Sequence, residues 1–212
     1  VQLAISYELM GRLDDAKARY EQLAKNYSAT EGGEKAKGAL RRLTLTGNKL
    51  QLAGKTLYQK DLSSAQYNGK VLLVVFWASY AQPFTTDLPA IQAVYSKFNK
   101  DGFEILGVNM DGDLSTLSAY LKEHGITWQS LREAPKENGM QPGDFDYGIV
   151  SVPTMFLVNK GGIVEGGITT GNLEFAVDAL LKGKKLESLQ APNTESPGTA
   201  EKPTAEKPKA RS

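Results

Sequence analysis

From Leu3 to Tyr27, apolar and small residues recur every three or four positions, and Gly11 interrupts the series. This spacing is that of an amphipathic helix, so the pattern predicts two helices joined near Gly11. Glycine readily adopts the left-handed conformation that ends many helices, and Ala16 is small enough to let the second helix pack closely on the first. We therefore expect a helical hairpin at the start of the chain, followed by a third helix from Glu34 to about Leu45.

Beyond Gly47, Asn48 and Gly54, short apolar runs alternate with amphipathic segments, which is the pattern of an α/β fold. The run from Val71 to Trp77 is the clearest strand, because it is apolar and rich in β-branched residues. The other expected elements are a helix over 83–98, a strand over 103–110, a helix over 114–123, a hairpin of 154–159 and 163–165, and a closing helix over 174–181.

After Leu189 the chain consists mainly of Pro, Thr, Glu, Lys and Ala, without aromatic or branched apolar residues. Such a composition cannot bury enough apolar surface to fold, so we expect a disordered tail. The predicted domains are a helical segment over 1–47, an α/β domain over 48–187 and the tail over 188–212. Because Val1 already lies within a helical pattern, we expect the helical segment to be truncated at its start.

The charge balance argues against nucleic acid and anionic membranes as partners. Lysine and arginine number 25 against 24 acidic residues, so the chain has no general attraction to nucleic acid or to anionic membranes. The longest apolar stretch, Val71 to Ala78, has the length of a buried strand, and we expect no membrane insertion by this chain. The chain has no cysteine, which leaves its redox compartment undetermined.

The spacing A-x-x-Y-x-x-x-G-x-x-x-x-A-x-x-x-Y-x-x-L, from Ala4 to Leu23, resembles one tetratricopeptide (TPR) repeat. An ordinary two-helix hairpin explains the same residues. Such repeats bury their faces by stacking on one another. The resemblance therefore implies further repeats before Val1 and a scaffold that binds peptides or proteins.

The segment G-K-V-L-L-V-V-F-W-A-S-Y-A-Q-P-F, residues 69–84, resembles the active-site segment of the thioredoxin superfamily, in which a strand ends in W-A-x-x-C-x-P-C. The segment Y-G-I-V-S-V-P-T-M-F-L-V-N-K-G-G, residues 147–162, resembles the second signature of that superfamily, which places a cis proline at Pro153. The sequence D-G-F-E-I-L-G-V-N-M-D and the region after Gly125 further resemble the TlpA-like (redoxin) branch.

The resemblance implies a thioredoxin-like fold, with a central mixed β-sheet flanked by helices, over about 52–186. Because TlpA-like proteins are commonly bacterial and exported, it also implies an extracytoplasmic, periplasmic location.

This chain departs from the family at the residues that perform its chemistry. Ala81 and Phe84 occupy the two cysteine positions, and Val75 replaces the buried acid that many thioredoxins have before the Phe-Trp pair. Only a thiolate attacks a disulfide, so these positions are vestigial and no catalytic residue is expected. Neighbouring hydroxyl residues have no evident base, because the single histidine, His124, follows a distant helix.

We expect no metal and no cofactor. The sequence Asp111-Gly112-Asp113 hints at a calcium loop, but its acidic spacing does not continue. A strand-to-helix turn with Asp113 as the N-cap explains it better.

A surface remains where the family binds an extended partner segment, between the cis proline loop and the helix N-terminus. The resemblance implies a partner-binding groove made of Trp77, Tyr80, Phe84, Val152, Pro153 and Thr154. Two interpretations of Phe84 stay open. Either its ring is exposed and adds apolar area to a docking surface, or it turns inward and fills the empty cysteine site.

Two functions follow. The first is a redox-inactive thioredoxin-fold pseudoenzyme, acting as a protein-interaction module on a helical-repeat scaffold with a protein or peptide partner. The alternative is a thiol-disulfide oxidoreductase of the TlpA-like family, whose reactive cysteines lie outside this chain or on a partner. A peroxidase of the related peroxiredoxin type also needs a cysteine, so the same absence argues against it.

Overall fold

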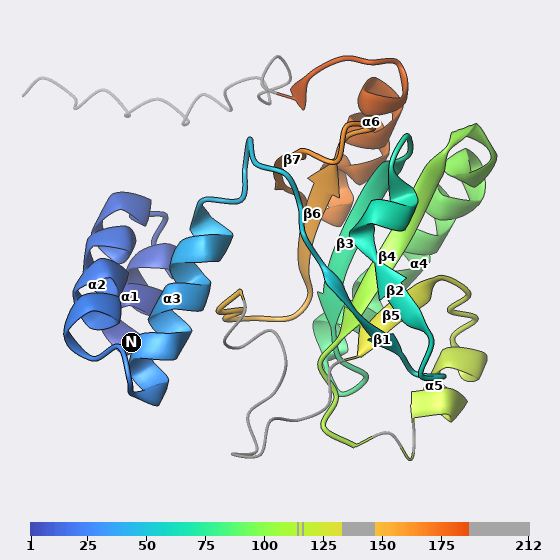
Figure 1. The fold of residues 1–212 in the computed structure, drawn as a ribbon. Helices are drawn as coiled ribbons and strands as arrows, with labels where there is room; N and C mark the ends of the chain where they lie inside the picture. The colour runs from blue at the N-terminus through green and yellow to red at the C-terminus, as the bar shows by residue number, and fades with distance from the viewer. Residues whose placement is uncertain (114, 116, 133–146, 187–212) are drawn as a thin grey trace, which may run out of the picture.

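The computed structural model describes residues 1–113, 115, 117–132 and 147–186 (Figure 1). The predicted disordered tail lies outside the described residues. The described part begins with three helices, α1 (Gln2–Leu9), α2 (Leu13–Asn26) and α3 (Glu31–Leu43). Gly11 has a φ of 73°, which confirms the predicted helical hairpin and the reason for its glycine. Helix α3 begins three residues earlier than predicted, because the Thr30 hydroxyl caps it by accepting a hydrogen bond from the N–H of Gly33.

The three helices have a hydrophobic cluster of their own, separate from that of the sheet. Four of its five buried residues are alanines, and small side chains allow helices to approach closely; the five are Ala4, Ala16, Tyr20, Ala36 and Ala39. The hydroxyl of Tyr20 donates a hydrogen bond to Glu8 at 2.6 Å. The structure thus shows three helices that pack on one another. Their assignment to a TPR stays a proposal.

The rest of the described chain forms one mixed sheet in the order β2-β1-β5-β4-β3-β6-β7. Its central strands are parallel: β3 (Val71–Trp77), β4 (Phe103–Asn109) and β5 (Gln129–Arg132). The strands on either side run antiparallel to their neighbours: β1 (Ala53–Thr56), β2 (Asp61–Ser63), β6 (Thr154–Val158) and β7 (Val164–Gly167). Two short 3-10 helices complete this part, η1 (Ser64–Tyr67) and η2 (Asn99–Asp101).

The sequence analysis missed β1, β2 and β5. These strands are only three or four residues long, and each buries a single residue, so they show no readable alternation of apolar and polar positions. Strand β3, in contrast, is buried at all of its positions, as its unbroken apolar run predicts.

Three helices pack beside the sheet: α4 (Gln82–Phe98), α5 (Leu117–Glu123) and α6 (Thr170–Leu181). Helices α4 and α6 lie side by side, joined by a 2.6 Å ion pair between Lys97 and Glu174. The prediction that Asp113 caps α5 stays a prediction, because the start of this helix adjoins positions 114 and 116, which lie outside the described residues. The carboxylate of Asp113 accepts hydrogen bonds from the N–H and the hydroxyl of Ser115, at 2.9 and 2.8 Å.

Helix α3 lies beside the segment that leads into β6, drawn in orange next to the blue helices in Figure 1. Gly148 in this segment has a φ of +51°, and a Cβ atom at this position would lie 2.4 Å from the backbone nitrogen of Ala39. Arg42 of α3 donates hydrogen bonds to the carbonyl oxygens of Tyr147 and Gly148 at 3.0 and 3.2 Å. The helical segment therefore touches the domain directly upstream of Pro153.

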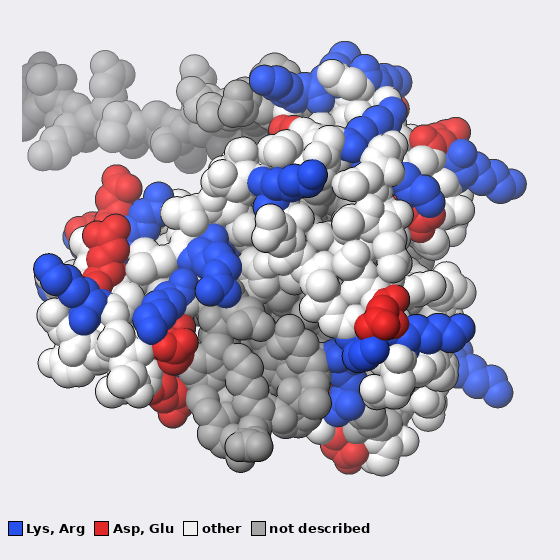
Figure 2. Space-filling model, viewed as in Figure 1, with Lys and Arg blue, Asp and Glu red and all other residues white. Residues whose placement is uncertain are grey.

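The surface is mixed in charge. Figure 2 shows basic and acidic side chains interspersed over the helical segment and over the sheet domain. This distribution fits the net charge of +1 and offers no broad field of one sign on this face. Among the described residues, no helix combines the length and the apolar character needed to cross a membrane.

Candidate functional site

Ala81 and Phe84 stand at the start of α4, the location that the sequence predicts for the two vestigial cysteine positions. Ala81 is the N-cap residue, and the N–H of Phe84 donates a hydrogen bond to its carbonyl oxygen at 3.0 Å. Both side chains are buried, with exposed fractions of 7% and 0%. A methyl group and a phenyl ring cannot attack a disulfide, so these two positions support no thiol exchange.

Phe84 is one of three stacked aromatic residues at this position. Its ring centroid lies 4.8 Å from that of Trp77, with 28° between the ring planes. Tyr120 of α5 also stacks on Trp77, at 6.0 Å and 25°. Aromatic side chains bury about 150–250 Å² each, so this stack contributes substantially to the core. It fills the space beside Ala81, at the start of α4, with hydrocarbon.

The ring of Trp77 is held in place from the neighbouring strands. Its Nε1 donates a hydrogen bond to the hydroxyl of Ser130 on β5 at 3.3 Å. Gly107 on β4 leaves room for this contact, since a Cβ atom there would lie 2.1 Å from Oγ of Ser130 and 2.8 Å from Nε1 of Trp77. A larger residue at position 107 would displace the indole ring.

The expectation that Trp77 and Phe84 form part of a partner-binding groove is wrong, because both side chains have an exposed fraction of 0%. Of the two interpretations of Phe84, the inward one holds. The physical reason is that the face of Trp77 offers the phenyl ring an apolar environment, and its removal from water is favourable at about 25 cal/mol per Å².

The other residues of the expected groove remain accessible. Tyr80 is 73% exposed, and Val152, Pro153 and Thr154 are half-buried. The peptide bond between Val152 and Pro153 is cis. Phe76 near the end of β3 pairs with Thr154 at the start of β6. The loop after β3, with Tyr80, and the loop before β6, with Pro153, therefore lie at the same end of these two strands. Their role in binding a partner stays a prediction.

Asp111 holds the loop between β3 and α4, a role that the sequence analysis missed. Its carboxylate accepts hydrogen bonds from the backbone N–H of Ser79 at 3.1 and 3.0 Å, from the Ser79 hydroxyl at 2.9 Å and from the side-chain amide of Asn109 at 2.6 Å. Hydrogen bonds to an ionised carboxylate are stronger than neutral ones. The local motif gave no signal of this role, because Ser79 lies 32 residues away in sequence.

The described part of the chain was also searched for side chains that could together bind a metal ion. Among the described residues, no group of three or more Asp, Glu and His side chains is placed to hold a metal ion. His124 follows α5, and its ring packs on Tyr120 at a centroid distance of 4.2 Å. The ring of His124 thus packs against the aromatic stack at the end of α5.

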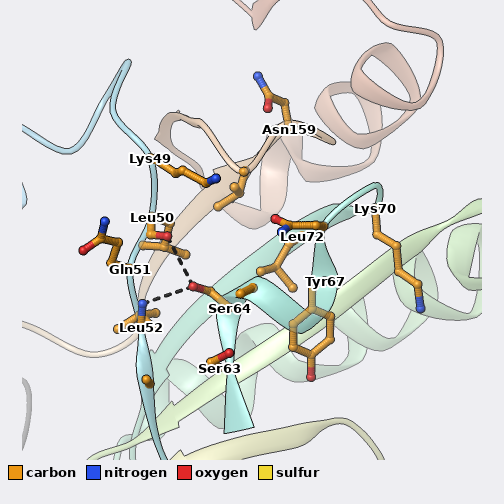
Figure 3. A pocket seen from close by; sticks show the side chains of 15 residues that line it. Lys49, Leu50, Gln51, Leu52, Ser63, Ser64, Tyr67, Lys70, Leu72 and Asn159 are labelled. Carbon is orange, nitrogen blue, oxygen red and sulfur yellow. Dashed lines mark hydrogen bonds between the residues drawn. The ribbon is translucent and has the colours of Figure 1, made fainter.

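Figure 3 shows a cavity of about 540 Å³ near the beginning of β3, at the opposite end of that strand from Ala81. Two of its polar residues, Ser64 and Lys70, have partners within the chain. The hydroxyl of Ser64 accepts from the N–H of Leu52 at 3.1 Å and donates to the carbonyl oxygen of Leu50 at 3.3 Å, as the dashed lines show. Lys70 forms an ion pair with Glu104 at 2.8 Å. These groups are therefore satisfied without a ligand.

The sheet domain is similar to known proteins. Residues 68–164 match the family model described as thioredoxin-like. The chain is 26% identical over 120 residues to the thiol-disulfide oxidoreductase ResA of Oceanobacillus iheyensis, a match that covers 55% of this chain and 60% of that protein. It is 30% identical over 123 residues to the thiol:disulfide interchange protein HelX of Rhodobacter capsulatus, covering 55% of this chain and 64% of the relative.

Solved structures confirm the predicted fold. The thioredoxin domain of a thiol-disulfide oxidoreductase from Bacteroides vulgatus superposes with a TM-score of 0.58 at 22% identity, over 64% of this chain and 97% of that one. A thiol:disulfide interchange protein from Chlorobium tepidum superposes with a TM-score of 0.53 at 26% identity, over 64% and 96% of the two chains. This chain therefore has a thioredoxin-like fold, is similar over its sheet domain to thiol-disulfide oxidoreductases such as ResA, and has no cysteine.

Proposed function

We propose that this chain is a redox-inactive interaction module that binds an extended segment of a protein partner beside Pro153. The observation that supports this proposal most directly concerns the backbone hydrogen-bonding groups of Val152. Its backbone N–H and C=O make no hydrogen bond with any described residue, although it lies two positions before β6. An extended peptide gains affinity by pairing with such unpaired main-chain groups at the edge of a sheet.

The exposed ring of Tyr80 supports the same surface. Tyrosine supplies a large apolar area and a polar hydroxyl at a low cost in conformational entropy, and it is enriched at the centres of protein interfaces. Asp111 fixes the preceding residue, Ser79, so the loop holds the ring near one place before a partner binds. In this proposal the thiol chemistry of the family is lost and its mode of recognition is kept.

The test is selection of extended peptides from a random library on the intact chain, followed by titration of the selected peptides. We expect Tyr80→Ala to weaken binding at least about fivefold, since truncating a central contact residue often costs more than 1 kcal/mol. Phe175→Ala is the matched control, because Phe175 is also an exposed aromatic residue, 60% accessible, but lies on α6. Binding that is indifferent to Tyr80, with no change in the amide NMR signal of Val152, would exclude this surface.

The names of the relatives favour a second candidate, a thiol-disulfide oxidoreductase whose cysteines lie outside this chain or on a partner. The two candidates differ in a simple assay. For this chain alone we expect reduction of insulin by dithiothreitol at the rate of the buffer blank, because no protein sulfur nucleophile is present. Acceleration that depends on cysteines of a longer form of the protein would favour the second candidate.

The proposal extends to the helical segment and to the location. We propose that α1 and α2 form a TPR-like unit that stacks on another helical repeat or on a partner. Large apolar residues of these helices are exposed in support of this: Leu3, Leu9, Met10 and Leu13. By resemblance to the TlpA-like branch we also propose an extracytoplasmic location in a bacterium, which fractionation of cells expressing the complete protein would test.

A further inference from the structure

Residues 147–153, here called the proline segment, lead into β6 and are anchored on the sheet domain at both ends. The ring of Tyr147 packs on Phe76 of β3 at a centroid distance of 5.6 Å, and its hydroxyl donates a hydrogen bond to the carbonyl oxygen of Gln51 at 2.9 Å. At the other end, Thr154 pairs with the same Phe76 across β3 and β6. The sheet therefore fixes where the proline segment begins and where it ends.

Helix α3 holds the beginning of the proline segment as well, and Figure 1 shows the two side by side. Nε of Arg42 donates hydrogen bonds to the carbonyl oxygens of Tyr147 and Gly148 at 3.0 and 3.2 Å. Gly148 lies so close to this helix that a Cβ atom there would be 2.7 Å from Cα of Ala39. These contacts restrain the backbone shortly before Val152, whose main-chain groups form the centre of the proposed peptide surface.

A buried network fixes Arg42 itself. Its Nη2 lies 2.9 and 2.8 Å from the two carboxylate oxygens of Glu8 on α1, and that carboxylate also accepts a hydrogen bond from the hydroxyl of Tyr20 on α2 at 2.6 Å. The side chains of Arg42 and Glu8 are only 10% and 7% exposed, so water competes little for these bonds. All three helices therefore determine where one guanidinium group meets the proline segment.

The middle of the proline segment is less constrained than its beginning. Ile149 is buried, but Val150 and Ser151 are exposed and Val152 is half-buried. Near the end of the segment, the hydroxyl of Thr154 donates a hydrogen bond to the carbonyl oxygen of Ser151 at 2.6 Å. Exposed backbone with few buried contacts opens at a low cost in free energy. The conformation of Val152 therefore depends on the contacts that hold the beginning of the segment.

We propose that Arg42 is a positioning residue for the peptide surface, which holds the proline segment in the conformation that presents the backbone of Val152 to a partner. This inference rests on the proposed function. Because its side chain is buried and its donors are occupied by Glu8 and by the proline segment, Arg42 acts through the segment and not by touching the partner. When only a fraction of the free molecules is competent to bind, the apparent affinity falls by that fraction.

The test replaces Arg42 by lysine in the intact chain. Lysine keeps the positive charge beside Glu8, but its ammonium group is a point charge on a flexible stem and lacks the planar fork that reaches Glu8 and the proline segment together. The probe is an extended peptide that was selected on the parent chain and whose binding depends on Tyr80. Arg19→Lys is the matched control, because Arg19 is exposed on α2 of the same helical segment.

We expect Arg42→Lys to bind this peptide at least about fivefold more weakly, through slower association at an unchanged rate of dissociation. The reason is that fewer free molecules hold the competent conformation, while the bound state stays the same. Loss of a direct contact would instead appear mainly as faster dissociation. Arg19→Lys should match the parent in both rates. Urea titration first establishes that each variant is folded in the binding buffer.

The free proteins give a second measurement, the NMR relaxation dispersion of the backbone amides of residues 149–152. We expect exchange between microseconds and milliseconds in Arg42→Lys, and none in the parent or in Arg19→Lys. Should Arg42→Lys fail to fold, Glu8→Gln takes its place. This variant keeps the shape of the carboxylate, weakens its hold on Arg42 and should slow association about twofold, since a charge-assisted hydrogen bond is replaced by a weaker one.

Three results would overturn the role of Arg42: peptide binding as tight as that of the parent, weaker binding that arises only from faster dissociation, or the absence of exchange in residues 149–152. If Tyr80→Ala still weakens binding in those cases, the proposed peptide surface stands without this inference. A parent chain that binds no extended peptide, or binds one with indifference to Tyr80, overturns both.

Discussion

Arg42 of α3 donates a hydrogen bond from Nε to the carbonyl oxygen of Tyr147 at 3.0 Å, across 105 positions of the sequence. Its Nη2 lies 2.9 and 2.8 Å from the two carboxylate oxygens of Glu8 on α1. One planar guanidinium group thus joins the helical segment to the loop before Pro153, and the fixed fork of donors suits arginine to this role. The two charged side chains are only 10% and 7% exposed.

Arg42→Ala should therefore destabilise the protein by about 3–5 kcal/mol, the range for breaking a buried ion pair by removing one partner. The measurement is urea-induced unfolding followed by circular dichroism. Arg19→Ala is the control, because Arg19 is exposed on α2 and, among the described residues, its side chain hydrogen-bonds to Gln22 alone; we expect a change within about 0.5 kcal/mol. Equal losses for the two variants would contradict the role of Arg42.

Gly148→Ala should be more destabilising than the same change at another glycine with positive φ. A Cβ atom at Gly148 meets the backbone of Ala39 at 2.4 Å, whereas at Gly183, with a φ of +75°, it meets no atom within 4 Å. The backbone conformation alone costs about 1–2 kcal/mol at either site, and overpacking adds about 1–3 kcal/mol at Gly148. Unfolding free energies that agree within error would show that α3 and this loop do not pack together in solution.

Phe84→Ala should cost about 3–5 kcal/mol of stability, because it leaves a cavity beside Trp77. Tyr80→Ala, four residues earlier, should change stability by no more than about 0.5 kcal/mol, since that ring is 73% exposed. Thermal and urea unfolding of both variants give the comparison. A Phe84→Ala protein as stable as the parent would mean that the ring leaves the stack in solution.

Alkaline pH should weaken the fold partly through Tyr95. Burial, the negative charge of Glu104 and a 3.1 Å hydrogen bond to that carboxylate raise the pKa of Tyr95 to about 12, from about 10 in an unfolded chain. The folded state then holds this proton more tightly, so the stabilisation is complete below about pH 10 and is lost as the pH rises towards 12.

Tyr95→Phe should therefore flatten the dependence of the unfolding free energy on pH between about 10 and 12. Urea titrations at several alkaline pH values measure this slope. Tyr58→Phe, at a side chain that is 75% exposed, controls for the loss of one phenol. If the Tyr95→Phe protein has the same slope as the parent, the pKa of Tyr95 is not raised in the folded state.

The local pattern of apolar and polar residues was sufficient to predict the longer helices and strands. The unbroken apolar run of β3, the 3.6-residue period of α4 and the glycine between α1 and α2 each depend on neighbours within one element, so they are legible without a structure. The absence of cysteine is also a property of the sequence alone, and it excludes thiol chemistry at Ala81 and Phe84 whatever the packing.

Tertiary structure decided the direction of Phe84 and the burial of two donors on and beside β5. An apolar ring serves a docking surface or a core equally well, and only the packing of Phe84 on Trp77 of β3 shows that it lies in the core. Likewise, Trp128 and Arg132 are ordinary residues in the sequence, and only the packing buries Nε1 and Nε of these side chains without a partner among the described residues. Contacts between residues far apart in the chain depend on how the elements pack, which no local pattern records.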